Sequence, residues 1–484
     1  MEKINKTALK DFIPQWEDIK GVSLDSRDTK KGDLFLAFKG SQTDGNNYIK
    51  EAFSKGAVAV LSDSILEPTE KVFRLRSLKS DLGKIISNVY ENPSKKLKLI
   101  AVTGTNGKTS TVEFLSGMLN QKEAKCGYLS TIGWCLDGVN IQTKPSLTTP
   151  NSLEINKQLS LMNSIGMEYA ALEASSHGLD QGRLNGLEIN TAIFTSFSQD
   201  HLDYHKTMEN YAASKKKLFF DSSPKKSVIN VDNNLGRDIY SELKASNSVA
   251  YSVSESKEAD ILYTCFRDDL KKIVLKVSSP FGNEEIKLNT YSKYLAVNAL
   301  CSIISLVLEG FELKELAYSS SAIKFSKGRM SPIKLDDNNL CFIDYAHTPE
   351  ALEFALKELR SLGESTLWCL FGCGGERDKL KRMEMGKVSK LYSDKVVLTN
   401  DNPRGEEPSL IIEDIMKGIE SNNDIKVELD RKKAIDYCLT EMIGNKKKNI
   451  LLIAGKGHEE FQEVNGKKKE FSDFIQVEKF LEEV

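Results

Sequence analysis

The chain has 484 residues, which is too long for one hydrophobic core and predicts about three domains of ordinary size. Its 67 basic and 69 acidic residues nearly balance, and the net charge of -2 argues against a nucleic-acid binder with a basic surface. The balanced charge instead favours small-molecule partners. Residues 1–6 lead into no apolar core of signal-peptide length, and no later stretch approaches the ~20 apolar residues of a membrane span. Because the eight cysteines are dispersed, we expect a cytoplasmic protein with reduced thiols and no structural zinc.

The first part of the chain alternates short apolar runs with turns. Residues 34–38 and 57–61 are the clearest of these runs, and they predict strands. Residues 93–96, Pro-Ser-Lys-Lys, have the composition of a linker. We therefore expect a small α/β domain over residues 1–95, which precedes any nucleotide-binding signal.

An apolar run at residues 99–102 leads into T-G-T-N-G-K-T-S, which predicts a strand, a phosphate-binding loop and a helix that begins near Lys108. The glycines let backbone N–H groups turn toward an oligophosphate, Lys108 neutralises phosphate charge, and Thr109 can ligate Mg²⁺. The usual spacing has a glycine where this chain has Val102. We expect ATP to bind at Gly104, Thr105, Asn106, Gly107, Lys108, Thr109 and Ser110.

Beyond this loop, apolar runs alternate with helix-length segments, a pattern that predicts a mainly parallel sheet covered by helices. Residues 301–308 predict a buried helix, and residues 325–329 form a polar junction. We expect a three-domain α/β fold, with a central P-loop ATPase-like domain at 96–328 and a C-terminal Rossmann-like domain at 329–484. The strands expected in these two domains are residues 169–172, 191–194, 227–230, 341–343, 367–370, 396–398 and 450–453.

Two polar side chains follow expected strands of the central domain. Glu173 closes the run at residues 169–172, and His201 comes after the run at 191–194. Adjacent parallel strands would bring both side chains to one edge of the sheet near the P-loop, where a carboxylate and an imidazole can hold Mg²⁺ against phosphate oxygens. The alternative for Glu173 is an acid that caps a helix.

Lys215 differs from the two lysines that follow it. Tyr211, Leu218 and Phe219 lie four residues before it, three after it and four after it, so the helical period gives Lys215 an apolar face. Burial of this kind favours the neutral amine. A neutral amine can react with carbon dioxide to form a carbamate, which would be an anionic metal ligand.

Charged groups also follow two expected strands of the third domain. Arg377 lies in G-C-G-G-E-R-D-K after one strand, and Arg404 lies in D-N-P-R after the next. Because guanidinium groups bind carboxylates through two hydrogen bonds, we expect a small acidic substrate here. The alternative for Arg404 is a residue that only caps the turn after Pro403.

Together these motifs resemble those of the Mur ligases of peptidoglycan synthesis, and most closely the members that add the third peptide residue, usually meso-2,6-diaminopimelate. The resemblance covers all three expected domains. The motifs occur in the family's order: T-G-T-N-G-K-T-S at 103–110, E-A-S-S-H-G-L at 173–179, D-H-L-D-Y-H at 200–205, D-Y-A-H-T-P at 344–349, G-C-G-G-E-R-D-K at 372–379, D-N-P-R at 401–404 and G-K-G-H-E at 455–459.

The resemblance implies roles for individual residues. The uridine nucleotide would bind at Ser26, Ser41, Gln42 and Thr43. The muramoyl dipeptide would bind at Thr148, Thr149, Ser175, Gln181 and Arg183, and the amino acid at Arg377, Asp401, Asn402, Arg404, Gly455 and Glu459. The catalytic residues would be Lys108, Glu173, His201, a carbamylated Lys215 and His347, with Asp344 on the ATP side. Two Mg²⁺ ions would be held by Thr109, Glu173, His201 and Lys215.

The reaction that the resemblance implies is ATP-dependent amide formation by a monomer. The terminal carboxylate of UDP-N-acetylmuramoyl-L-alanyl-D-glutamate takes the γ-phosphoryl group, and an amine of diaminopimelate then displaces phosphate. A rigid-body rotation of the third domain is expected to bring Asp344 and His347 to ATP. Ser196 and Gln199 stand where relatives often have asparagine and arginine, and Glu376 replaces a common aspartate.

Three alternatives stay open. The same ligase could add L-lysine, although its terminal ammonium group would be repelled by Arg404. Folylpoly-γ-glutamate synthetases use the same chemistry, but they leave the first domain and D-N-P-R unexplained. A P-loop ATPase switch, which ligates nothing, would need a base-reading N-K-x-D motif, and the chain has none.

Overall fold

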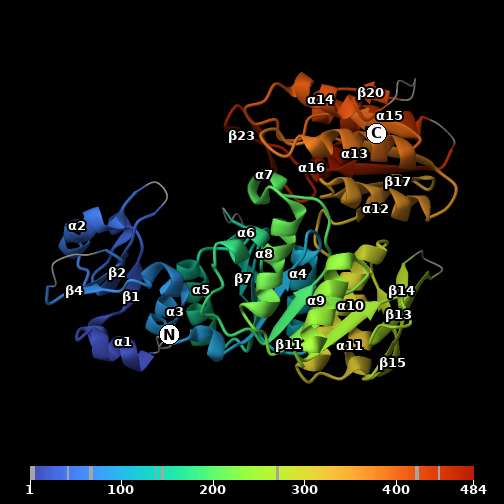
Figure 1. Ribbon diagram of the computed structural model, residues 1–484. Helices are drawn as coiled ribbons and strands as arrows, with labels where there is room; N and C mark the ends of the chain where they lie inside the picture. Colours follow the sequence, from blue (N-terminus) through green and yellow to red (C-terminus); the bar gives the residue numbers. More distant parts are fainter. Residues whose placement is uncertain are drawn as a thin grey trace.

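A computed structural model describes residues 6–40, 43–64, 69–136, 138–142, 147–268, 272–419, 425–444 and 447–483. Within these ranges the strands form a four-stranded, an eleven-stranded and a six-stranded sheet, together with a two-stranded hairpin. Figure 1 shows the N-terminal sheet in blue beside the central sheet, with the C-terminal sheet above it in orange and red. No helix in the described ranges is both long and apolar enough to cross a bilayer. The eight cysteines are all free thiols.

The N-terminal sheet is parallel, with the strand order β1-β2-β3-β4. Alternate residues of its central strand point to opposite faces. Leu34 and Leu36 pack under α1 and α3, whereas Phe35 and Ala37 pack under α2. The elements are β1 (Gly21–Ser23), β2 (Asp33–Ala37), β3 (Ala59–Ser62), β4 (Val72–Arg74), α1 (Lys6–Phe12), α2 (Ile49–Ser54) and α3 (Leu78–Val89).

The central sheet has the order β15-β14-β13-β12-β11-β10-β5-β9-β6-β7-β8 and is parallel from β13 to β6. The strand that leads into the P-loop is β5 (Lys98–Thr103), which lies between β10 and β9. The remaining strands are β6 (Cys126–Ser130), β7 (Gly133–Leu136), β8 (Val139–Gln142), β9 (Tyr169–Glu173), β10 (Thr191–Phe194), β11 (Lys226–Asn230), β12 (Ala250–Ser254), β13 (Ile261–Arg267), β14 (Ile273–Ser279) and β15 (Gly282–Leu288).

The helices cover both faces of the central sheet. Ile100 and Val102 pack with α4, α10 and α11, and Leu99 and Ala101 pack with α5, α8 and α9. The apolar run at residues 301–308 is the buried end of α10, as predicted. The helices are α4 (Lys108–Gln121), α5 (Ser152–Ser164), α6 (Ser176–Asp180), α7 (Leu202–His205), α8 (Met208–Phe220), α9 (Asn234–Ala245), α10 (Lys293–Leu308) and α11 (Leu313–Ser319).

One expectation about this sheet is wrong. The strands that carry Glu173 and lead to His201 are not neighbours, because β5 lies between β9 and β10. The order of strands along the chain does not give their order in a doubly wound sheet, where the first strand is often central. All three strands are parallel, so their carboxyl ends still meet at one edge.

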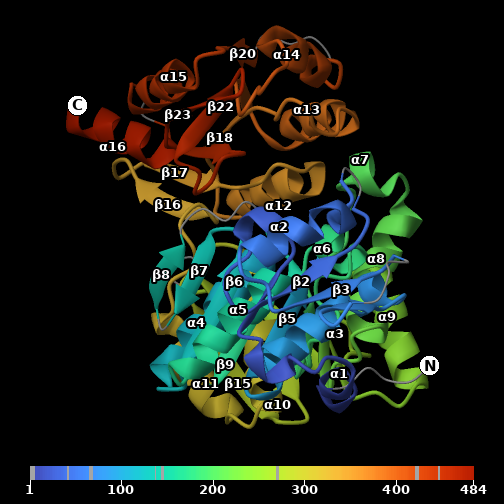
Figure 2. The same ribbon diagram turned by 90° about the vertical axis from the view of Figure 1, so that its left-hand side faces the viewer.

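The C-terminal sheet has the order β16-β17-β21-β18-β19-β20, with only β16 antiparallel among its described strands. Helices α12, α13 and α14 cover one face, and α15 and α16 cover the other. Among the helices of the C-terminal segment, α12 lies nearest the central sheet (Figures 1 and 2).

The four strands expected for this sheet are present as β17 (Asn339–Asp344), β18 (Thr366–Phe371), β19 (Lys395–Leu398) and β21 (Asn449–Ala454). The sequence did not predict the two edge strands, β16 (Ser331–Lys334) and β20 (Ile425–Val427), or the hairpin of β22 (Phe461–Val464) and β23 (Lys467–Glu470). The helices are α12 (Pro349–Arg360), α13 (Leu380–Tyr392), α14 (Pro408–Met416), α15 (Arg431–Ile443) and α16 (Asp473–Glu483).

The N-terminal segment packs tightly against the central one. Pro93 and Ser94, in the stretch of linker composition, are buried, and Ser94 Oγ accepts a hydrogen bond from Glu188 N (2.9 Å). In α3, a Cβ atom at Gly83 would lie only 1.9 Å from Asn185 O. The junction is therefore a fitted contact, and a glycine in α3 allows the close approach.

Replacing Gly83 by alanine tests this contact. Glycine lowers helix stability, but at Gly83 the added methyl group meets a backbone carbonyl, so we expect Gly83→Ala to destabilise the protein by about 1–3 kcal/mol. Gly117→Ala in α4 is the matched control, because its Cβ would lie at an ordinary 3.4 Å from Ile323 Cγ2. Thermal unfolding should show a loss for the first variant and none for the second; equal stabilities would contradict the account.

Candidate functional site

The P-loop turns sharply at its two glycines. Gly104 has φ 155° and Gly107 has φ 88°, and a Cβ atom there would lie 2.0 Å from Thr195 Oγ1 and 2.5 Å from Asn298 Nδ2, respectively. Both positions therefore require glycine. Ser196 Oγ accepts a hydrogen bond from Asn106 N (3.0 Å), so this departure from the family pattern retains a polar contact with the loop.

Lys108 begins α4 and folds back over the loop. Its Nζ donates hydrogen bonds to Gly104 O and Thr105 O, both at 2.9 Å. Burial lowers the pKa of Lys108, while the nearby Glu173 and Asp200 oppose that shift. Thr109 and Ser110 are buried in the first turn of the same helix.

Glu173 is fully buried at the end of β9, and its carboxylate has a fixed orientation. It accepts hydrogen bonds from Thr131 N (2.9 Å) and Thr131 Oγ1 (3.1 Å). The helix that follows is capped by Ser175, whose Oγ accepts from Gly178 N (3.1 Å). The alternative that Glu173 is a helix-capping acid is therefore wrong.

His201 lies at the cleft beside Asp200. Its Nε2 is 3.5 Å from Asp200 Oδ2, and its backbone has φ 54°. Burial lowers the pKa of His201 to about 4, and this effect outweighs the attraction of Asp200. The imidazole is therefore neutral near pH 7, the form in which its ring nitrogen can act as an acceptor or a ligand.

Lys215 is buried in α8, as its helical period predicts. Its Nζ lies 4.5 Å from the centroid of the Tyr211 ring, and the Tyr211 hydroxyl donates to Thr105 Oγ1 (3.1 Å) in the P-loop. Burial and the nearby Lys108 lower the pKa of Lys215 well below its usual value. Lys216 and Lys217 point outward instead, toward Glu242 and Asp180. These contacts join the lysine to the P-loop through one tyrosine.

The expected metal ligands do not form a site from acidic and imidazole side chains alone. Over the described residues, no three His, Cys, Asp or Glu side chains gather as they would around a metal ion. Glu173 and His201 would need the Thr109 hydroxyl, a modified Lys215 and phosphate oxygens to complete a coordination sphere.

The residues expected to hold the dipeptide gather next to Glu173. Thr149 Oγ1 donates to Glu173 O (2.7 Å) and lies 2.9 Å from Ser175 Oγ. Arg183 donates to Thr149 O and to Gln181 Oε1 (2.6 Å). Four of the five expected residues therefore form one connected group, and Thr148 lines the neighbouring cavity described below.

A separate cavity lies in the N-terminal segment, where Ser26 and Thr43 line it together with Phe35 and Glu51. Ser26 is buried, and its Oγ donates to Glu51 Oε2 (2.9 Å). Ser41 and Gln42 lie outside the described residues.

One cavity joins the central and C-terminal segments. From the central segment come Thr148, Asp200 and His201; from the C-terminal segment come His347, Arg377, Lys381, Asp401, Asn402, Arg404, Gly455 and Glu459. His347 Nδ1 is 2.7 Å from Tyr345 O, and burial together with the nearby Lys381 lowers its pKa. Burial raises the pKa of Asp200, but His201, His347 and Lys381 outweigh this effect and lower it to about 2.

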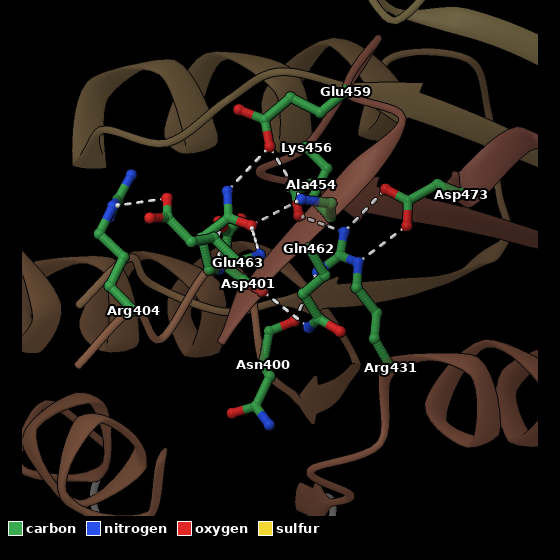
Figure 3. A network of polar contacts seen from close by, with 11 residues as sticks. Asn400, Asp401, Arg404, Arg431, Ala454, Lys456, Glu459, Gln462, Glu463 and Asp473 are labelled. Carbon is green, nitrogen blue, oxygen red and sulfur yellow. Dashed lines mark hydrogen bonds and ion pairs between the residues drawn. The ribbon is translucent and has the colours of Figure 1, made fainter. Parts of the chain in front are cut away.

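Inside this cavity, the D-N-P-R and G-K-G-H-E loops are bonded to each other (Figure 3). Asn402 Nδ2 donates to Glu459 Oε2 (2.9 Å), and the buried Lys456 donates to Asn402 Oδ1 (3.1 Å) and to Glu459 Oε2 (2.8 Å). Arg404 donates to Gly375 O (2.8 Å) and lies 3.5 Å from Glu463 Oε2. Arg404 therefore contacts both the loop after β18 and strand β22, which a simple turn cap would not do.

Sequence reasoning missed several residues here. Lys456 stands inside G-K-G-H-E, where only Gly455 and Glu459 were expected to have a role, and Lys381 lies two residues after the end of G-C-G-G-E-R-D-K. Arg329 and Asn298 stand beside the P-loop, and a cavity there is lined by Asn106, Gly107, Ser110, Arg329 and Asp344. Arg329 Nε and Asn298 Nδ2 are buried without a hydrogen-bond partner in the part of the chain that the structure describes. The only signal for Arg329 was its position in the junction at residues 325–329.

Models of known protein families match most of the chain. The match to the "Mur ligase family, catalytic domain" covers residues 18–104, that to the "Mur ligase middle domain" covers 102–306, and that to the "Mur ligase, glutamate ligase domain" covers 328–457.

Curated relatives match over almost the whole length. The UDP-N-acetylmuramoyl-L-alanyl-D-glutamate--2,6-diaminopimelate ligase of Chromobacterium violaceum is 36% identical and aligns with 99% of this chain and 98% of its own. The ligase of the same name from Rickettsia conorii is 39% identical over 96% of each chain. A solved structure of a ligase with this name superposes with a TM-score of 0.72 at 32% identity, covering 96% of this chain and 95% of its own. The chain therefore belongs to the Mur ligase family, a family of ATP-dependent ligases.

Proposed function

We propose that this protein joins meso-2,6-diaminopimelate to UDP-N-acetylmuramoyl-L-alanyl-D-glutamate in peptidoglycan precursor synthesis. The names of the curated relatives support this activity. The observation that carries the proposal is the shared cavity, because Asp200 and His201 line it with Arg377 and Arg404. An activated carboxylate on one side and an amino acid on the other would then be in reach of each other.

The proposed reaction has two steps. A carboxylate oxygen of the D-glutamyl residue takes the γ-phosphoryl group of ATP, and ADP leaves. The amine of the incoming amino acid then attacks the acyl carbon, phosphate leaves with that oxygen, and the amine loses a proton. Phosphoryl transfer depends on positioning and charge neutralisation, which the P-loop N–H groups and Lys108 can supply.

The three segments would divide the substrates among them. Residues 1–95 would bind the uridine nucleotide, with Ser26, Thr43 and the undescribed Ser41 and Gln42; the cavity beside Ser26 supports this role. Residues 96–328 would bind ATP and the dipeptide, the latter through Thr148, Thr149, Ser175, Gln181 and Arg183. Residues 329–484 would bind the amino acid through Arg377, Asp401, Asn402, Arg404, Gly455 and Glu459. We further propose that the protein acts as a monomer.

ATP would lie along residues 104–110, with Asp344 and His347 on its far side. A cavity lined by both Asn106 and Asp344 supports this arrangement. A rigid-body rotation of the C-terminal segment would bring Asp344 and His347 to ATP, and the lining of that cavity by residues of two segments supports such a movement.

Magnesium would be held at two sites by Thr109, Glu173, His201 and a carbamylated Lys215. Mg²⁺ is typically bound by one or two carboxylates together with substrate phosphates, and the fixed Glu173 carboxylate can provide one such ligand. A carbamate on the buried Lys215 amine would supply a second anionic oxygen. When bound, the metal would neutralise charge on the phosphoryl group.

Two substitutions at Glu173 separate the effect of its negative charge from the effect of its hydrogen bonds to Thr131. Glu173→Gln keeps an oxygen for Thr131 N, and the Thr131 hydroxyl can reverse its hydrogen bond, so stability should be nearly unchanged. Turnover should fall by about 100-fold or more, because the anionic ligand is lost. Glu173→Ala should also cost about 1–3 kcal/mol of stability. Calorimetry and steady-state kinetics measure both effects, and wild-type turnover in Glu173→Gln would exclude the metal role.

Lys215→Ala should lose most activity and regain part of it with a short-chain carboxylate that replaces the carbamate. The lowered pKa of Lys215 favours the neutral amine that carbon dioxide attacks. Lys216→Ala is the matched control, since its side chain points toward Glu242. A Lys215→Ala enzyme as active as this control, with no response to the carboxylate, would exclude the carbamate.

A competition assay with diaminopimelate and L-lysine tests the choice of amino acid. We expect incorporation of diaminopimelate, because Arg404 can pair with its distal carboxylate and would repel the ammonium group of lysine. Arg404→Ala should weaken diaminopimelate binding by about 2–4 kcal/mol, since a desolvated carboxylate is left unpaired. Lys379→Ala, in the exposed part of the neighbouring loop, serves as control. Preferential incorporation of lysine by the wild type would contradict the assignment.

A further inference from the structure

A fully buried ion pair lies behind the amino-acid cavity. Arg431 Nε donates to Asp473 Oδ1 and Arg431 Nη2 donates to Asp473 Oδ2, both at 2.8 Å, and neither side chain is exposed. The two residues begin α15 and α16, so the pair joins the starts of two helices that cover one face of the C-terminal sheet. Figure 3 shows the pair next to the D-N-P-R and G-K-G-H-E loops.

Burial of two charges is a poor way to stabilise a fold, because the loss of hydration offsets most of their attraction. The other bonds of Arg431 are therefore informative. Its Nη2 donates to Ala454 O (2.9 Å), and its Nη1 donates to Asn400 O (3.3 Å). One guanidinium group thus holds a carboxylate and two backbone carbonyls, which requires a planar group with several donors.

The two carbonyls come immediately before the two loops of the cavity. Asn400 precedes Asp401, and Ala454 ends β21 and precedes Gly455. The loops touch at this point, because Gly455 has φ 111° and a Cβ atom there would lie 2.5 Å from Asp401 Oδ2. A small change in the spacing of these carbonyls would therefore move both loops.

We propose that Arg431, held by Asp473, is a positioning residue that sets the spacing of the two loops that bind the incoming amino acid. The proposal rests on the function proposed above for the C-terminal cavity. Because its side chain is fully buried, Arg431 acts through the loops and not by touching the amino acid. The bonds between Asn402, Lys456 and Glu459 depend on the same spacing.

Arg431→Lys is the first test. Lysine keeps the positive charge beside Asp473, but its single nitrogen cannot also span two carbonyls in a fixed plane. We expect KM for the amino acid to rise about tenfold or more, while kcat stays within about threefold and the KM values for ATP and the nucleotide substrate stay within about twofold. This split separates a positioning role from a general loss of structure.

Arg360→Lys is the matched control. Arg360 also pairs with an aspartate, Asp394, and donates a hydrogen bond to a backbone carbonyl, Ser365 O. These contacts lie at the amino ends of the strands, at the edge of the same sheet opposite to the cavity. We expect its KM for the amino acid to be unchanged. A wild-type amino-acid KM in Arg431→Lys, or equal changes in all three KM values, would overturn the proposal.

A double variant covers the case in which Arg431→Lys does not fold. Arg431→Met combined with Asp473→Leu removes both charges together, which proteins often tolerate. It should show the same rise in amino-acid KM, and a wild-type KM in the folded double variant would overturn the proposal. Two separate measurements therefore test the two proposals. The choice of amino acid by the wild-type enzyme tests the proposed function, and the ratio of variant to wild-type KM for that amino acid tests the positioning role of Arg431.

Discussion

The parallel pairing of β5 with β9 and β10 determines where the polar loops of the central sheet begin. Val102 stands opposite Glu173, and Thr103 stands opposite Phe194. The P-loop, the Thr149–Ser175 group and the segment that leads to Asp200 and His201 therefore start side by side at one edge. Parallel strands leave their carboxyl ends together, and this arrangement brings residues from distant parts of the sequence to one place.

The C-terminal sheet follows the same rule. Asp344 stands opposite Ala454, and Phe371 stands opposite Leu398, so the loops after β17, β21, β18 and β19 leave from one edge. This edge and the edge of the central sheet line a common cavity. Two sheets with separate cores thus place Asp200 and His201 in one cavity with Arg377 and Arg404, which is the arrangement that the proposed amide ligation would need.

Much of this could be predicted from local sequence pattern. Apolar runs gave the strands, the motifs after them gave the loops, and the helical period correctly indicated that Lys215 is buried while Lys216 is not. The order of the strands within the central sheet could not be predicted in this way, because no residue near Glu173 indicates that β5 separates β9 from β10. Thr131 and Asp473 were missed for a related reason: each is an ordinary residue whose importance comes from a partner 42 positions away, Glu173 for the first and Arg431 for the second.

In the proposed reaction, a substrate carboxylate takes the γ-phosphoryl group of ATP and is then joined to an amine in the shared cavity. An isotope experiment tests it most directly. The nucleotide dipeptide is labelled with oxygen-18 in both carboxylates of its D-glutamyl residue and incubated with ATP and diaminopimelate. The account predicts that phosphate release requires all three substrates and that each phosphate carries one labelled oxygen. Unlabelled phosphate, or release from ATP alone at the same rate, would contradict it and would indicate an ATPase that forms no acyl phosphate.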